Sequence, residues 1–112
     1  MLMKKTAEVV KPKEIQAVIL AADILGDEAV LTYKISRALS ISEGDVQQAL
    51  AELIKFLYLS AYYKVSLTPS HKIDLVWHEF ILFTRTYAQF CQTHFQRFIH
   101  HQPDDDTNNN CA

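Results

Sequence analysis

The sequence predicts an all-α protein, a single domain of about five helices that ends in a C-terminal helical hairpin. The chain of 112 residues has room for one hydrophobic core. It contains only two Gly and three Pro, so its uninterrupted segments are long. Apolar residues recur at spacings of three and four, which is typical of helices. We expect a flexible lead-in over residues 1–11, the helical domain over 12–103, and a disordered acidic tail over 104–112.

Three helices are expected in the first half of the chain. The first covers about residues 12–25, because Pro12 suits a first helical turn and Gly26 suits a C-terminal cap. Asp27 is expected to cap the second helix and Ser42 the third, with Asp45 three residues on as a short capping box. Their inner faces are predicted from apolar spacing: Ile15, Val18, Ile19 and Ile24; then Leu31, Ile35, Ala38 and Leu39; then Val46, Ala49, Leu50, Leu53, Ile54 and Leu57.

Two more helices are expected after a connector over residues 62–68. Pro69 ends whatever precedes it, and Ser70 is a favourable cap for a fourth helix over about 71–83. The chain is expected to restart at Thr84 or Thr86 and to form a fifth helix over about 85–97. The inner side of the fourth helix is predicted to carry Ile73, Val76, Trp77, Phe80 and Ile81. The fifth helix is expected to contain Tyr87, Phe90, Cys91, His94 and Phe95.

Charge and cysteine usage exclude several classes of function. The formal net charge is -2, and three of the acids are Asp104, Asp105 and Asp106, so the rest of the chain stands near +1 (-2 plus 3). This balance makes nucleic acid an unfavourable partner and does not favour an anionic membrane. The apolar stretch over residues 17–25 is too short to span a bilayer. Cys91 and Cys111 do not form a disulfide framework, so we expect a soluble, cytoplasmic protein with both thiols reduced.

Chemistry-bearing residues concentrate between Pro69 and Pro103. This stretch holds the single Trp, all five His and five of the six Phe. Asp74 and His78 are four apart and share one helix face, as Cys91 and His94 do at a spacing of three. If the last two helices form an antiparallel hairpin, the two faces meet, and the His pair at 100 and 101 can fold back over them.

A zinc-type metal site is therefore one interpretation of this stretch. Its ligands would be His78, Cys91 and one of His100 or His101, because thiolate and imidazole are preferred zinc donors. Asp74 would be a fourth ligand or a carboxylate that orients an imidazole. The structural alternative is a hydrogen-bonded pair of His78 and Asp74 beside a core thiol, with His94 solvated. No Cys-x-x-Cys or His-Glu-x-x-His pattern decides between them.

The same residues resemble the glycine-rich domain-containing protein-like family, a group of largely unknown function. The likeness is carried by Pro69–Ser70, Asp74 to His78, Ile81–Leu82, Tyr87, Phe90–Cys91, Phe95 and Phe98 to Pro103. It implies that one site contains Asp74, Trp77, His78, Tyr87, Cys91, His100 and His101. The chain departs from the family at Gln96, where members often have a Gly at a tight turn. It also departs at Phe80, where a second His would stand.

Three functions remain open at this point. The first is a small helical structural or interaction module with the metal or polar site, which would act on a protein partner. The second is a helix-turn-helix DNA-binding protein over residues 35–53, in which Gln47 and Gln48 would read bases. Glu43 and Asp45 at the entrance of that helix would repel phosphate. The third is an enzyme with Cys91 as the nucleophile and His78 or His101 as the base.

Overall fold

The computed structural model describes residues 12–63 and 67–101, with the side chains of residues 12–15 left aside. Within these ranges the protein is all-α and contains five α-helices, which confirms the predicted fold class. They are α2 (Pro12–Asp27), α3 (Ala29–Leu39), α4 (Val46–Tyr63), α5 (His71–Ile81) and α6 (Thr84–Phe95), with a 3-10 turn at Glu43–Asp45 before α4. The predicted lead-in and acidic tail lie outside the described residues.

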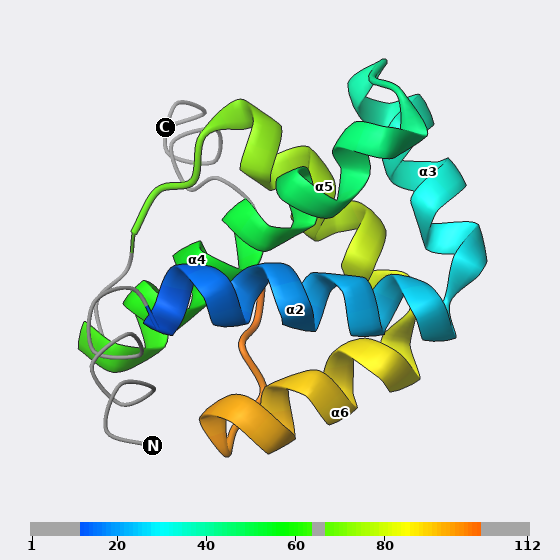
Figure 1. Cartoon of the computed structure of the whole chain (residues 1–112). Helices are drawn as coiled ribbons and strands as arrows, with labels where there is room; N and C mark the ends of the chain where they lie inside the picture. Colours follow the sequence, from blue (N-terminus) through cyan, green and yellow to red (C-terminus); the bar gives the residue numbers. More distant parts are fainter. Residues whose placement is uncertain (1–11, 64–66, 102–112) are drawn as a thin grey trace, which may run out of the picture.

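Helix α4 is the central element of the core. Its inner face is fully apolar, and every residue predicted for it is buried: Val46, Ala49, Leu50, Leu53, Ile54 and Leu57. Helix α2 packs along it more extensively than any other helix does, and α5 covers another part of its surface (Figure 1). Seven buried side chains on one helix make α4 dependent on its neighbours, because burial of this face supplies most of its stability.

The predicted inner face of the first helix is confirmed only in part. Among its described side chains, Ile24 is buried and Val18 packs against the core as predicted, whereas Ile19 is 54% exposed. Ala17 and Ala21 are buried too, and the apolar spacing of the larger residues did not indicate them. Small side chains let the backbones of α2 and α4 approach closely. The Gln47 side-chain amide of α4 donates a 3.0 Å hydrogen bond to the Val18 carbonyl and secures this packing.

Two of the predicted helix boundaries are wrong. Gly26 does not end α2, which continues through Asp27, and no glycine in the described residues has a positive φ. The residue before α3 is Glu28, not Asp27, and its side chain makes no capping hydrogen bond. The carboxylate of Glu28 instead accepts a hydrogen bond of 2.5 Å from the Thr86 hydroxyl and ties the α2–α3 junction to the first turn of α6.

Of the two caps predicted from Ser residues, the Ser70 cap is confirmed and the Ser42 cap is wrong. The Ser70 hydroxyl accepts a 3.1 Å hydrogen bond from the Ile73 amide and caps α5, as expected. Ser42 precedes the 3-10 turn, and its hydroxyl bonds the Asp45 carboxylate rather than a backbone amide. Connector residues 62 and 63 are helical, because α4 extends to Tyr63.

Helices α5 and α6 form the predicted hairpin through a tight turn at residues 82 and 83. The Phe83 amide donates to the Phe80 carbonyl, and the Tyr87 amide donates to the Phe83 carbonyl, so α6 starts at Thr84. In Figure 1 the two helices diverge from this turn, and the C-terminal segment (residues 97–101, orange) runs back from the end of α6 behind α2. The hairpin thus leaves an angle that the C-terminal segment enters.

Gln96 directs the chain into that segment. It adopts the left-handed conformation (φ 58°, ψ 22°). Its backbone N–H donates a hydrogen bond to the Gln92 carbonyl, and α6 ends there. A tight turn, which a glycine would favour, therefore forms here with a glutamine. A side chain in this conformation costs roughly 1 kcal/mol relative to glycine, because Cβ approaches the following carbonyl.

Replacing Gln96 by Gly should therefore stabilise the protein. We expect Gln96→Gly to raise the free energy of unfolding by about 0.5–1 kcal/mol, because relief of the left-handed strain exceeds the added entropy of the unfolded chain. Urea denaturation measures this directly. The control is Gln89→Gly, at an exposed position within α6, which should lower stability by about 1 kcal/mol. A loss of stability in both variants would contradict the assignment of the turn.

Candidate functional site

The candidate site is built around the hydroxyl group of Tyr87. Tyr87 is fully buried on α6, and its hydroxyl accepts a 3.0 Å hydrogen bond from the indole N–H of Trp77 on α5. The same hydroxyl donates a 2.5 Å hydrogen bond to the backbone carbonyl of Ile99 in the C-terminal segment. One oxygen therefore joins α5, α6 and the C-terminal segment, and it satisfies a buried indole donor and a buried carbonyl at once.

Aromatic packing fixes this arrangement. The Tyr87 ring meets Phe80 edge-on at 5.1 Å between centroids and Phe98 edge-on at 5.3 Å. Burial raises the pKa of the Tyr87 hydroxyl, so the group stays a neutral donor and acceptor across the physiological range. The side chain of Ile99 is itself buried in the core. The segment after α6 is thereby anchored by both a side chain and a carbonyl.

A second polar contact holds the end of the same segment. The Nε2 atom of His101 lies 2.7 Å from a carboxylate oxygen of Asp74, in the first turn of α5. The His101 ring also packs edge-on against Trp77, with centroids 4.4 Å apart. Because a carboxylate only accepts hydrogen bonds, the geometry assigns a proton to Nε2 of His101. In the neutral ring, Nδ1 then carries a free lone pair.

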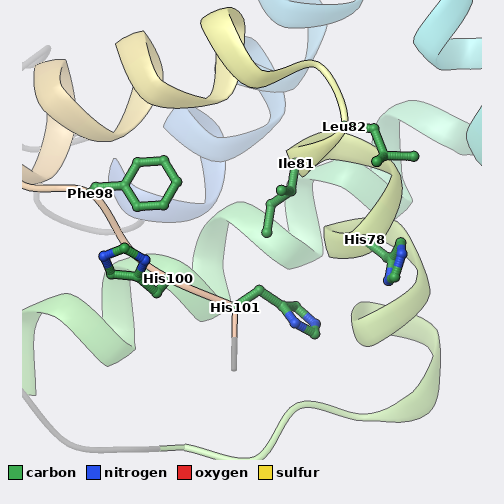
Figure 2. A pocket seen from close by; sticks show the side chains of 6 residues that line it. All are labelled: His78, Ile81, Leu82, Phe98, His100 and His101. Carbon is green, nitrogen blue, oxygen red and sulfur yellow. The ribbon is translucent and has the colours of Figure 1, made fainter. Parts of the chain in front are cut away.

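Between α5 and the C-terminal segment lies a hollow with a volume of about 300 Å³ (Figure 2). It is lined by three residues of the α5 end, His78, Ile81 and Leu82, and three of the segment, Phe98, His100 and His101. Leu82 is 63% exposed and Phe98 41% exposed, so apolar surface flanks the opening. The polar groups of the lining are imidazoles, and no acidic residue contributes to it.

The structure brings most of the predicted site residues together. Asp74, His78, His100 and His101 lie at or beside the hollow, with Trp77 and Tyr87 beneath. The expected pair of Asp74 and His78 is wrong, because the carboxylate contacts His101 instead. His78 remains exposed, and its ring centroid lies 6.1 Å from that of His101. A helical spacing of four therefore identified the right face but the wrong imidazole.

Cys91 lies apart from the hollow. It is completely buried on α6, beside the hydroxyl of Tyr87 and the backbone of Ile99. Burial raises the pKa of its thiol, and hydrogen bonding toward Ile99 and Tyr87 offsets only part of that rise. The structure thus places Cys91 in the core, as the structural alternative expected. Within residues 12–63 and 67–101, no three His, Cys, Asp or Glu side chains are grouped to hold a metal ion.

Three residues of the hollow were not predicted as site residues: Ile81, Leu82 and Phe98. Ile81 was expected only on the inner side of its helix, and it projects toward the C-terminal segment (Figure 2). A signal for Phe98 is present in the sequence, because the pair Phe98–Ile99 is apolar and follows the last helix directly. Ile99 is the anchor of that pair, and its neighbour Phe98 faces the hollow.

His94 also differs from the expectation of a solvated side chain. It is half-buried against the ring of Phe90, with centroids 4.6 Å apart, and its Nδ1 atom lies 2.9 Å from the Tyr58 hydroxyl of α4. Burial lowers the pKa of His94, because the charged ring loses hydration there. His94 therefore serves the contact between α6 and α4 and not the hollow.

The two alternative functions gain no support from these positions. In a helix-turn-helix protein Gln47 would face DNA, yet its side-chain amide is bound to the Val18 carbonyl, and the inner face of α4 is buried in the core. In a cysteine-dependent enzyme the thiol would be accessible with a lowered pKa, whereas Cys91 is buried with a raised one. Within the described ranges, no helix is both long enough and apolar enough to cross a bilayer.

Removing the Tyr87 hydroxyl should destabilise the fold. We expect Tyr87→Phe to lower the free energy of unfolding by about 2–3 kcal/mol, because a buried indole N–H and a buried carbonyl lose their partner together. Chemical denaturation gives the value. Tyr33→Phe is the matched control, since the exposed Tyr33 hydroxyl bonds only Arg37, and its cost should stay below about 0.5 kcal/mol. Equal costs for both variants would contradict the buried network.

The lowered pKa of His94 predicts a pH dependence of stability. The unfolded chain binds more protons than the folded one below the ordinary His pKa of about 6.5. The contribution of His94 is therefore present above that pH and is lost as the pH falls toward the lower, folded-state value. Urea denaturation between about pH 7.5 and 5.5 should show a smaller decline for His94→Gln than for the parent. His71→Gln, at an exposed position, should retain the decline of the parent.

Comparison with known proteins identifies the family of the chain. No curated protein matches the chain, and no solved structure matches it. The model of the uncharacterised UCP032817-like family matches residues 28–110, which is well over half of the chain. The matched region begins at Glu28 and includes α3 to α6, the C-terminal segment and every residue that lines the hollow. The chain belongs to the UCP032817-like family.

Proposed function

We propose that the protein is a small structural or interaction module whose binding surface is the hollow between α5 and the C-terminal segment. The observation that carries the proposal is the contrast between the two sides of this region. Beneath it, the Trp77–Tyr87–Ile99 hydrogen bonds are buried and complete, whereas above it Leu82 and Phe98 expose apolar surface beside the exposed imidazoles of the lining. A rigid base with an exposed apolar opening suits recognition of a partner.

The polar network has a structural role in this proposal. Asp74, His101, Trp77 and Tyr87 hold the C-terminal segment in place, and the segment forms one wall of the hollow. No residue is assigned to catalysis. A cytoplasmic setting and the likeness to the glycine-rich domain-containing protein-like family stay predictions of the sequence, and neither adds an activity.

An apolar probe tests the hollow as a binding surface. N-acetyl-leucinamide, added at roughly millimolar concentration to ¹⁵N-labelled protein, should shift the amide resonances of Ile81, Leu82 and Phe98. Leu82→Ser should weaken this binding, because it removes exposed apolar surface without opening a core cavity. Leu59→Ser is the matched control, since Leu59 is 48% exposed at a position outside the hollow. Shifts spread evenly over the surface, or none, would contradict the proposal.

A zinc-type ion is the second candidate occupant, favoured by one observation. A carboxylate that holds one nitrogen of a His ring leaves the other nitrogen as a metal donor, and this arrangement is common behind metal-bound histidines. Asp74 holds His101 in this way, and His78 lies across the hollow at 6.1 Å between ring centroids. His100 would be a third donor after a side-chain rotation. Cys91 has no place in this set.

Elemental analysis of protein purified without chelator tests the metal candidate. The parent should contain about one equivalent of zinc, and His78→Ala and His101→Ala should lose it. His71→Ala should keep the ion, because His71 is exposed on the same helix and does not line the hollow. Cys91→Ala should keep it too. Absence of zinc from the parent after adding the ion back would refute this candidate and leave the interaction module standing.

A further inference from the structure

We infer that the hollow takes the free carboxyl end of a partner peptide whose last residue is apolar. This inference rests on the proposed function, because it names the ligand for the same surface. It is carried by the chemistry of the lining, which combines apolar side chains with the imidazoles of His78 and His100, neither of which makes a hydrogen bond with another described residue.

The hydrogen-bonding groups of the lining match the end of a peptide chain. His78 and His100 are exposed and make no hydrogen bond with any other described residue, so each neutral ring has an N–H to offer. Figure 2 shows these two rings on opposite sides of the hollow, so a terminal carboxylate would accept from one of them at a time. His101 has its Nε2 atom engaged with Asp74, so its Nδ1 lone pair can accept the amide N–H of the last residue. The lining thus offers donors for a carboxylate and one acceptor for an amide.

The charges around the hollow also favour a carboxylate. None of the six lining residues is acidic. The carboxylate of Asp74 is bonded to His101, and Glu79 lies beside His78 in sequence but about 100° away around the helix. A bound carboxylate would therefore meet imidazoles rather than like charges. Lys72 is engaged elsewhere, by Glu52 of α4.

The size of the hollow favours a chain end over a continuous segment. Its volume of about 300 Å³ lies at the small end of ligand sites and suits one residue with its adjoining peptide group. A segment bound in the middle would have to leave in two directions past Leu82 and Phe98, whereas a chain end leaves in one. These two apolar residues instead cover the side chain of the last residue.

Titration of the full chain with matched peptides, in the presence of a chelator, tests the inference. Acetyl-alanyl-leucine with a free carboxylate should bind about tenfold more tightly than its amide, since hydrogen bonds to a charged group are worth roughly 1.4 kcal/mol or more. Acetyl-alanyl-glycine should bind at least several-fold more weakly, because it lacks the apolar side chain. His78→Ala with His100→Ala should abolish the preference for the acid, and His71→Ala should preserve it.

The outcomes separate this inference from the function on which it rests. If the acid and the amide bind equally well and shift the resonances of the hollow, the ligand class is wrong and the interaction module stands. If neither binds, both are wrong. The compound 4-methylpentanoate carries the same apolar group and carboxylate without an amide. Binding of this compound as tightly as the peptide acid would overturn the assignment to a peptide end and indicate a small apolar acid.

Discussion

The hydroxyl of Tyr87 is the point on which the C-terminal half of this structure depends. It accepts the Trp77 indole proton and gives its own proton to the Ile99 carbonyl, inside a core where water cannot replace either partner. An unsatisfied buried donor or acceptor costs about 1–3 kcal/mol, which is large against the total stability of a small domain. The short chain after α6 has no regular backbone pairing of its own, so this contact fixes its path.

The proposed function depends on the path of the C-terminal segment. With Ile99 held in the core, the flanking residues Phe98 and His100 line the hollow, and His101 contacts the Asp74 carboxylate and packs edge-on against the Trp77 ring. The chemistry-bearing residues between Pro69 and Pro103 thus have two roles. Some of them hold the C-terminal segment in place. The others, His78 and His100, form the proposed binding surface together with the apolar opening.

The helices could be predicted from sequence, and much of the site could not. Helical spacing identified the inner face of α4 and the buried pair of Trp77 and Phe80, because these depend on local periodicity. The Ser70 cap was identified from the residue type that follows Pro69. The partner of Asp74 is set by a segment that is not helical, and no periodicity places His101 there. The face of α2 was predicted only in part, because Ala17 and Ala21 contribute to it beside Ile24. The turn at Gln96 forms without glycine because burial of Ile99 outweighs its local strain.

Hydrogen exchange of the Trp77 indole proton tests the central claim most directly. The chain has a single Trp, so one resolved resonance reports on the bond to Tyr87. If this bond holds α5, α6 and the C-terminal segment together, the indole proton should exchange only through global unfolding. Its protection free energy should then match that from denaturation. Exchange as fast as that of an exposed indole, in a protein that remains folded, would show that the C-terminal segment is not anchored in this way.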